Sequence, residues 1–482
     1  MKTRLIEYIR QNFDQEFSDF VESSLAMMLI ENWAFIADTL SFKIDQLANE
    51  MFIDSVTELE NAFRLAKLVG FQPQPPIAAR SLWTASLNNT LNTDIEIAGG
   101  LAVEVAAGAQ TLTIELFPAD SENNPIFNQN ILIPAGNVVN ASIIGLEGNT
   151  REIQTTGTGS IGQTISLTQS PVIFDSVQVY VDGIQWQKVD FFTDSQPRRE
   201  FRVEFDSSYN AFVIFGNNRA GLIPSTGSLI IVNYRQGGGA IGNIVSGAVQ
   251  KQTIVTAPGL AFAIPVTLRN YTRGEFGYDG DTIDDIRRKL PAWTRAQNRA
   301  VTGLDYKTLV DQFATPYQGQ VGKSVAILRN YGCSGNIIDI YVLAKDGNSD
   351  LTVCSDELKS SIQNFVDSRK MITDFVCLRN GEVIGVDVVL DITLERIYRK
   401  FEDEIRVKIE RRIENFFSLN NWEFGQNLRE PDLLKTLNDI KEIGSSNATF
   451  ATNDPDNGGD TVTARFFEIV RLDDLTINFN YE

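Results

Sequence analysis

Apolar side chains recur every three or four residues between Leu25 and Met51, and this long stripe strongly constrains the fold. Intervals of 4, 4, 3, 4, 4, 3 and 4 residues keep the stripe on one side of a continuous α-helix, as in the seam of a coiled coil. The stripe consists of Leu25, Leu29, Trp33, Ile36, Leu40, Ile44, Leu47 and Met51. The spacing therefore predicts one long helix whose apolar side needs a packing partner.

The segment after this helix is too short to supply that partner easily. A second helix is predicted from about Val56 to Val69, where Gly70 ends it, and the prolines of residues 73–76 make a stiff connector. We therefore expect residues 1–76 to form a helical region that joins a bundle with helices of another chain. The expected bundle face consists of Leu29, Trp33, Ile36, Leu40, Ile44 and Leu47. The alternative is that these side chains pack only on residues 56–69 of the same chain.

The composition changes after the prolines to Thr, Asn, Gly, Ile and Val. Short apolar alternations, such as 173–181 and 201–205, are separated by turn signals such as Asp182-Gly183. This pattern is typical of many short antiparallel strands, so residues 77–256 are predicted to form a β-rich domain. Residues 111–169, rich in Asn, Gly and Thr, are predicted to be an inserted β-subdomain.

Helical patterns return in residues 257–330, which we expect to be a helical connector. Ile283, Ile286 and Leu290 share one face, and Pro291 is expected to end that helix. Thr302 and Asp305 have the spacing of a capping box at the start of another helix.

Residues 331–482 alternate between strand and helix patterns. A strand around 337–343 is followed by a helix around 355–369, and a clean alternation from Val386 to Leu394 predicts a half-buried strand. A following helix is predicted to bury Ile397, Phe401, Ile405, Ile409, Ile413 and Phe416. The predicted fold class is α+β and multidomain: an N-terminal helical region, a β-rich middle with an inserted β-subdomain, and C-terminal α+β domains.

The composition excludes several classes of function. The chain of 482 residues has no histidine, which removes Ser-His-Asp and Cys-His catalysis and histidine metal sites. Its 42 basic and 62 acidic side chains give a net charge of −20, which argues against nucleic acid as the main partner. No catalytic constellation is found, so we expect a protein that is not an enzyme.

Two kinds of motif suggest a ligand but lack the surrounding pattern that such a site needs. Gly157, Gly159 and Gly162, and Gly237, Gly239 and Gly242, match the glycine spacing of a dinucleotide site, but an extended segment follows each instead of a helix. Two aspartate clusters, at residues 279–285 and 454–460, do not follow the order of a calcium-binding loop. The nearby Arg287, Arg288 and Lys289 favour ion pairs instead. No cofactor and no metal are expected.

The three cysteines, Cys333, Cys354 and Cys377, are an odd number in a chain far too long to depend on disulfides, and we expect them to be reduced and buried in the core. The first ten residues are charged and do not resemble a signal peptide. Since no window approaches 18 apolar residues, no membrane insertion is expected.

Three segments, taken in order, resemble the baseplate J-like family, the wedge proteins of contractile phage tails and related injection systems. The first comprises residues 37–54 (ADTLSFKIDQLANEMFID) and 62–71 (AFRLAKLVGF). The second runs from Phe215-Gly216 through Gly221, Pro224 and 230–234 (IIVNY) to the glycines at 237–243. The third comprises 277–281 (GYDGD), 285–287 (DIR), 299–302 (RAVT) and Asp305-Tyr306. A fainter match is 422–426 (WEFGQ) with Asp432-Leu433.

This resemblance implies a structural protein of the tail baseplate in the virion, assembled in the host cytoplasm and present in several copies. Its expected partners are other baseplate wedge proteins, the tail hub and further copies of itself in a ring. The N-terminal helices (1–76) are expected to join the wedge bundle, and residues 331–482 to form the ring. Rearranged ring contacts would then release sheath contraction, a conformational mechanism.

Two alternative functions remain open. The first is the equivalent wedge protein of a non-phage contractile injection system, which residues alone do not distinguish. The second is a tail-associated glycan-degrading enzyme, which would use a pair of carboxylates in a cleft. Such an enzyme would tend to fold as one long repeating β structure, and the sequence shows no such repeat.

Overall fold

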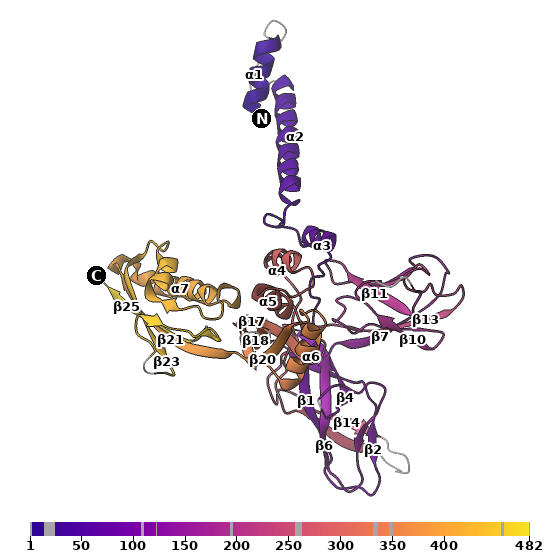
Figure 1. The fold of residues 1–482 in the computed structure, drawn as a ribbon. Coiled ribbons are helices and arrows are strands. Elements are labelled where there is room, and N and C mark those ends of the chain that lie inside the picture. The colour runs from indigo at the N-terminus through magenta and orange to yellow at the C-terminus, as the bar shows by residue number, and fades with distance from the viewer. Residues whose placement is uncertain are drawn as a thin grey trace. The chain divides into compact units, whose positions relative to one another are not determined.

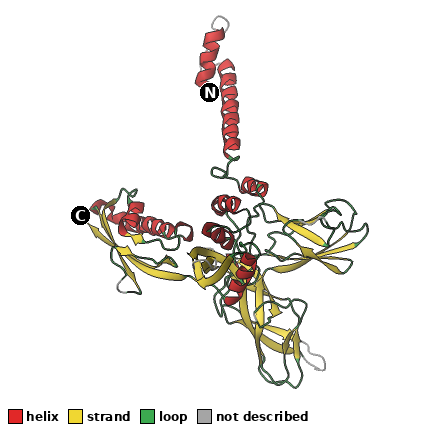
Figure 2. Ribbon diagram, viewed as in Figure 1, coloured by secondary structure: helices red, strands yellow, loops and turns green. Residues whose placement is uncertain are grey.

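The computed structural model describes residues 2–13, 25–107, 110–121, 123–192, 196–255, 263–330, 336–346, 350–454 and 457–481. The chain divides into two compact units. The helical unit comprises the described residues up to Pro73 together with Asp281–Leu290, and the main unit comprises Gln74–Gly280 and Pro291 onward. Helical and β-rich parts alternate along the chain (Figure 2), which confirms the predicted α+β multidomain class.

The helical unit contains α1 (Lys2–Phe13), α2 (Leu25–Asn49), α3 (Leu59–Leu68) and the first residues of α4 (Ile283–Ala296). Helix α2 covers almost the whole predicted stripe, because no glycine or proline interrupts residues 25–49. Helix α1 lies beside the first half of α2 (Figure 1), and Lys2 pairs with Glu31 across the two helices at 2.5 Å.

The carboxylate of Glu50 organises the link between α2 and α3. It accepts hydrogen bonds from the backbone N–H and the hydroxyl of Thr57, from the N–H of Glu58 and from the side chain of Asn61. The bond from the Thr57 hydroxyl is the main reason why the pKa of Glu50 falls to about 2. The guanidinium of Arg287 in α4 donates to the carbonyl of Val56, which ties α4 to the same link.

A six-stranded antiparallel sheet with the order β14-β15-β1-β6-β4-β3 forms the first β layer of the main unit. Its core includes Trp83, Ile143 and Val266, all fully buried. A pair of short strands, β2 (Ile95–Ile97) and β5 (Ile131–Ile133), adds to the same core. The six strands are β1 (Arg80–Ser86), β3 (Leu101–Ala107), β4 (Gln110–Pro118), β6 (Val139–Glu147), β14 (Gln250–Val255) and β15 (Ile264–Asn270).

A seven-stranded sheet with the order β7-β13-β9-β10-β11-β12-β8 follows, and only its β10–β11 pair is parallel. Its core includes Phe201, Phe215 and Tyr234. The strands are β7 (Asn149–Thr156), β8 (Thr164–Leu167), β9 (Gln178–Val181), β10 (Ile184–Lys188), β11 (Glu200–Phe205), β12 (Ala211–Phe215) and β13 (Leu229–Gln236).

Residues 111–169, the predicted inserted β-subdomain, contribute to three sheets. Strands β4 and β6 pair with each other and β6 pairs with β1, whereas β7 pairs with β13 and β8 pairs with β12. Strand β5 pairs with β2. Residues 111–169 therefore pair both with strands that precede them and with strands that follow them in the sequence. Antiparallel pairing can join segments that are far apart in the sequence, and composition does not reveal which segments pair.

The third part of the main unit is a sheet in which β18 pairs with β17, β19 and β20. Helices α5 (Gly303–Asp311) and α6 (Asp356–Asp367) share its core, through Leu309, Leu358 and Ile340. The sequence predicts a domain boundary at residue 330, but the sheet includes strands on both sides of it, because β17 pairs along its length with β18. The strands are β16 (Ala314–Thr315), β17 (Gly319–Asn330), β18 (Asn336–Asp346), β19 (Asp350–Val353) and β20 (Asp374–Asn380).

The C-terminal part is a three-stranded sheet, β23-β21-β25, with helices packed on one face. The alternation predicted for β21 is confirmed: Val386, Val388, Leu390, Ile392 and Leu394 are buried against α7. The elements are β21 (Glu382–Leu394), 3-10 helix η3 (Arg396–Phe401), α7 (Glu402–Phe416), η4 (Leu419–Asn421), β22 (Leu428–Arg429), α8 (Glu430–Leu434), η5 (Lys435–Leu437), β23 (Ile443–Thr452), β24 (Thr461–Val462) and β25 (Glu468–Tyr481).

Two helix predictions are wrong in their details. Pro291 lies inside α4, which continues to Ala296, so the proline removes one hydrogen bond without ending the helix. Ile397 and Phe401 are exposed, by 68% and 51%. They lie in the 3-10 helix η3, which has three residues per turn. Their side chains therefore do not continue the buried face of α7, whose period is about 3.6 residues.

The cysteine prediction is confirmed in part. Cys354 and Cys377 are both free thiols; Cys354 is buried, and burial raises its pKa to about 12. Cys377 is exposed, so its predicted place in the core is wrong, because it lies on a face of β20 that other residues leave open. Cys333 lies outside the described residues. Among the helices that the structure describes, none is long and apolar enough to cross a membrane.

Candidate partner-binding surface on helix α2

The six side chains of the predicted bundle face all lie on α2, and all are exposed in the single chain. Their exposed fractions range from 42% for Ile36 to 65% for Ile44 and Leu47, with Trp33 at 64%. The structure therefore brings the six together along one side of one helix and leaves them open to solvent. We call this set stripe A, which consists of Leu29, Trp33, Ile36, Leu40, Ile44 and Leu47.

Helix α1 covers a different side of α2. Met27, Ile30 and Ala34 are buried, and they lie on the first half of α2 where α1 runs beside it. From Asp38 to Asn49 every residue is exposed except the half-buried Gln46. The apolar side chains of the second half of α2 are thus uncovered by the described part of the chain, although Gln46 donates a hydrogen bond to Glu58 at 3.4 Å.

The segment of residues 56–69 does not cover stripe A either. Its helix α3 buries Ala62, Phe63 and Ala66, while the stripe residues remain exposed. The alternative interpretation, in which the stripe packs on this segment, does not describe the observed arrangement.

A second apolar stripe was missed by the sequence reasoning. Met28, Phe35 and Phe42 are 60%, 71% and 66% exposed. They are spaced by seven residues, and a heptad returns to nearly the same side of a helix. We call these three residues stripe B. The sequence signal for stripe B is this heptad spacing, which is weaker than that of the longer stripe because only three residues define it.

The two stripes face in different directions. An α-helix turns by about 100° per residue, so Phe35 lies about 200° around the axis from Trp33. Polar side chains, such as Asp38 and Asp45 on one side and Lys43 on another, separate the stripes. One neighbouring helix could not cover both stripes at once.

Exposed apolar side chains of this size are costly in water. Burying one large apolar side chain contributes about 1.5–3 kcal/mol, and contiguous exposed apolar patches on soluble proteins mark interaction sites. Met51 and Phe52, exposed by 71% and 67%, extend the apolar surface beyond the end of α2. The surface is thus suited to bind other helices.

The motifs that suggested a ligand have structural roles instead. Gly237, Gly238 and Gly239 have positive φ angles of 134°, 96° and 134°, and the N–H of Gly238 donates to the carboxylate of Glu147 at 2.6 Å. The segment that follows is only the three-residue 3-10 helix η1 (Ala240–Gly242), too short for the N-terminal site of a dinucleotide-binding helix. The other glycine match leads into strand β8.

The aspartates near α4 form ion pairs, as expected. Lys289 pairs with Asp281 at 2.5 Å, Arg287 with Asp284 at 2.9 Å and Arg288 with Asp285 at 2.9 Å. Within the described ranges, no group of three or more possible ligands is arranged to hold a metal ion. Asp456, of the second aspartate cluster, lies outside these ranges.

Comparison with known proteins finds a similarity for the N-terminal helices. Residues 2–68 match the family model described as bacteriophage baseplate protein, N-terminal domain. Over these residues the chain is similar to that family. All of α1, α2 and α3 lie within the match, so stripes A and B lie in the segment that is similar to a baseplate N-terminal domain. The predicted resemblance to baseplate proteins is thereby confirmed.

Two solved baseplate structures contain chains that are similar to this one. A chain of the cryo-EM structure of the anti-feeding prophage baseplate shares 12% identity, with 98% of this chain and 90% of that chain covered and a TM-score of 0.37. A chain of the type VI secretion system TssK-TssF-TssG baseplate subcomplex shares 9%, with 74% and 96% covered and a TM-score of 0.28. No curated protein matches the chain.

Proposed function

We propose that this chain is a structural wedge component of the baseplate of a contractile tail. It joins neighbouring wedge subunits into a ring around the tail hub and transmits the conformational change that triggers sheath contraction. The observation that carries the proposal is the exposed apolar surface of α2 inside the matched baseplate N-terminal domain. The resemblance of the later segments to the baseplate J-like family supports the wedge role.

Stripe A is the proposed contact with helices of neighbouring wedge chains. Its side chains are already ordered on a helix without a break, so little conformational freedom is lost when a partner binds. The apolar side chains in the second half of α2 are exposed among the described residues, and packing in an assembly would add to the stability of such a helix.

Trp33→Asp tests this contact in the assembled complex. The variant is co-expressed with the wedge partners encoded by neighbouring genes, and the complex is purified through a partner. Because Trp33 is 64% exposed in the single chain, the melting temperature of the chain alone should not change. Loss of a central aromatic contact costs about 2–4 kcal/mol, which weakens binding roughly 30- to 700-fold.

Ser41→Asp is the matched control. It places the same charge on an exposed residue of the same helix, outside both stripes. Wild-type yield of the complex with Ser41→Asp and a strong loss with Trp33→Asp would support the bundle. Wild-type yield with Trp33→Asp would show that stripe A is not the contact surface.

Ring-forming contacts are proposed to lie after residue 330, in the α+β parts of the chain. The same role in a non-phage contractile injection system is the alternative, and the neighbouring genes distinguish the two. A purified chain that turned over host glycans would instead point to a tail-associated enzyme.

A further inference from the structure

The C-terminal sheet has one covered face and one open face. On β21, Val388 and Leu390 point into the core beneath α7, so the residues between them lie on the opposite face. Asp387 and Asp391 are exposed there. Their neighbours on β23 and β25 on the same face, among them Asn447, Thr449, Asp474 and Asn478, are exposed as well.

This open face carries carboxylates without a compensating cation. Asp387 and Asp474 are direct neighbours in the register of the parallel strands β21 and β25. Neither forms an ion pair with any described residue of the chain, and Asp391 accepts a hydrogen bond only from Asn478, at 2.9 Å. Like charges side by side on a sheet repel each other, so a cation from outside would relieve this repulsion.

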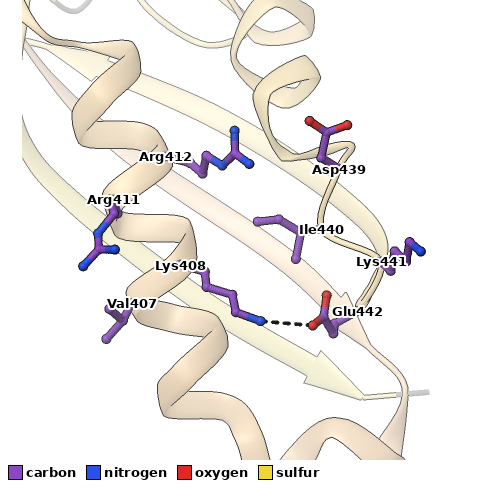
Figure 3. A pocket seen from close by; sticks show the side chains of 8 residues that line it. All are labelled: Val407, Lys408, Arg411, Arg412, Asp439, Ile440, Lys441 and Glu442. Carbon is purple, nitrogen blue, oxygen red and sulfur yellow. Dashed lines mark hydrogen bonds and ion pairs between the residues drawn. The ribbon is translucent and has the colours of Figure 1, made fainter. Parts of the chain in front are cut away.

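The helical side of the same domain carries the opposite charge. A groove of about 490 Å³ lies between α7 and the segment after η5. Its basic lining residues are Lys408, Arg411, Arg412 and Lys441. Figure 3 shows Lys408 and Arg412 extending from α7 toward the segment of Ile440, while Arg411 lies at the outer side of the helix. Its acidic residues are Asp439 and Glu442, so the lining has an excess of two positive charges in a chain of net charge −20.

One of these four basic side chains forms an ion pair within the described part of the chain, and three do not. Lys408 pairs with Glu442 at 3.2 Å, the one dashed contact in Figure 3. Arg411, Arg412 and Lys441 are exposed and form no ion pair among the residues that the structure describes. The groove therefore presents guanidinium and ammonium groups that can pair with carboxylates of another molecule.

We propose that the basic groove of one copy binds the acidic open sheet face of a second copy of this chain. The two surfaces lie on opposite layers of one domain, so each copy that uses its groove still offers its sheet face to the next. Such a head-to-tail contact repeats, and it closes into a ring when the rotation between copies allows. This contact rests on the proposed ring-forming role.

Exposed ion pairs are individually weak, and salt screens them. The contact therefore orients neighbouring copies and depends on several pairs at once, which predicts that rings separate as the salt concentration rises. Its occupant could otherwise be an acidic segment of a different baseplate protein, and the experiment distinguishes the two.

The test uses the full chain assembled with its wedge partners, with ring formation followed by negative-stain microscopy and sedimentation. Asp387→Lys with Asp474→Lys reverses the open face, and Arg411→Glu with Arg412→Glu reverses the groove. We expect each double variant to reduce the fraction of closed rings at least tenfold. All four changes in one chain should restore rings to within twofold of wild type, because the charges are complementary again.

Two controls accompany the charge reversals. Glu104→Lys with Glu152→Lys makes the same change in net charge on exposed positions of β3 and β7, and rings should form normally. Asp387→Asn with Asp474→Asn removes the charges with little change of shape, and rings should become fewer and less sensitive to salt. The far-ultraviolet spectrum and melting temperature of each chain alone establish that it is folded.

The outcomes separate the contact from the wider function. Rings at wild-type yield with either reversal, or no recovery in the fourfold variant, would overturn the proposed contact. If only the groove variant lost closed rings, a different acidic baseplate protein would be the occupant of the groove. That result would also overturn the proposed contact between copies. A wild-type chain that binds its wedge partners but never closes a ring would overturn the ring itself.

Discussion

The guanidinium of Arg235 in β13 forms an ion pair with the carboxylate of Glu115 in β4, and both side chains are buried. The pair joins the seven-stranded sheet to the six-stranded sheet. Arg235 also donates to the carbonyls of Leu146, Glu147 and Gly148 at 3.1–3.3 Å. A single side chain thus satisfies backbone groups where the chain passes from β6 to β7.

Arg235→Met should strongly destabilise the main unit. The substitution leaves the Glu115 carboxylate buried without its cation, and breaking such a buried pair costs about 3–5 kcal/mol. The free energy of unfolding measured in urea checks this expectation. Arg64→Met is the control, because Arg64 pairs with Glu60 on the surface and such pairs contribute at most about 1 kcal/mol. Equal losses in both variants would contradict the role of the buried pair.

Glu147 should make stability depend on pH. Burial is the main reason why the pKa of its carboxyl rises from 4.5 to about 7. A raised carboxyl pKa means that the folded state holds the proton more tightly than the unfolded state. Its stabilising contribution is complete below about pH 4.5 and is lost as the pH rises through about 7, with a total near 3 kcal/mol.

Glu147→Gln should remove this dependence. The amide oxygen can still accept the hydrogen bond from Gly238, but the side chain no longer ionises. The free energy of unfolding of the wild type, relative to that of the variant, should therefore fall by about 3 kcal/mol between pH 4.5 and pH 8. Urea denaturation over a series of pH values measures this difference, and parallel profiles of the two proteins would argue against it.

The capping box at the start of α5 offers a smaller and more local test. The hydroxyl of Thr302 accepts from the N–H of Asp305 at 3.3 Å, and the carboxylate of Asp305 accepts from the N–H of Thr302 at 2.8 Å. Thr302→Ala should lower the free energy of unfolding by about 0.5–2 kcal/mol. Thr302→Ser should lower it much less, because the serine hydroxyl can make the same capping hydrogen bond. A serine variant as unstable as the alanine variant would show that the lost methyl group, and not the cap, is responsible.

Local patterns were the most predictable part of this fold. The cap at Thr302, the alternation of β21 and the extent of α2 each depend on residues that are close together in the sequence. The pairing of β6 with β1, across the whole of β2–β5, depends on contacts that no local period encodes. Periodicity also failed where the backbone changed type, as at Phe401, whose spacing fits an α-helix although the residue lies in a 3-10 helix.

The candidate surface on α2 was predictable only in part, for a related reason. A stripe at helical spacing shows which side chains share a face, but their exposure is decided by what packs against them. Stripe A was found because its six residues belong to a longer pattern of eight, from Leu25 to Met51, and stripe B was missed because only three residues define it. The alternation of β21 already indicates that Asp387 and Asp391 share the face opposite its apolar side chains. The basic groove gave no sequence signal, because Arg412 and Lys441 come together only in the fold.

Stripe B should be needed for assembly as much as stripe A, because the two stripes lie on different sides of α2. Phe42→Asp is expected to leave the melting temperature of the single chain unchanged, since Phe42 is 66% exposed, and to reduce recovery of the co-expressed complex at least tenfold. Ser41→Asp again serves as the control. If the stripes bind different partners, Phe42→Asp and Trp33→Asp should each lose a different subunit from the purified complex. If both variants lose the same subunit, one partner contacts both stripes. Recovery of the complex at wild-type level with Phe42→Asp would contradict the prediction and would mean that stripe B stays exposed in the baseplate.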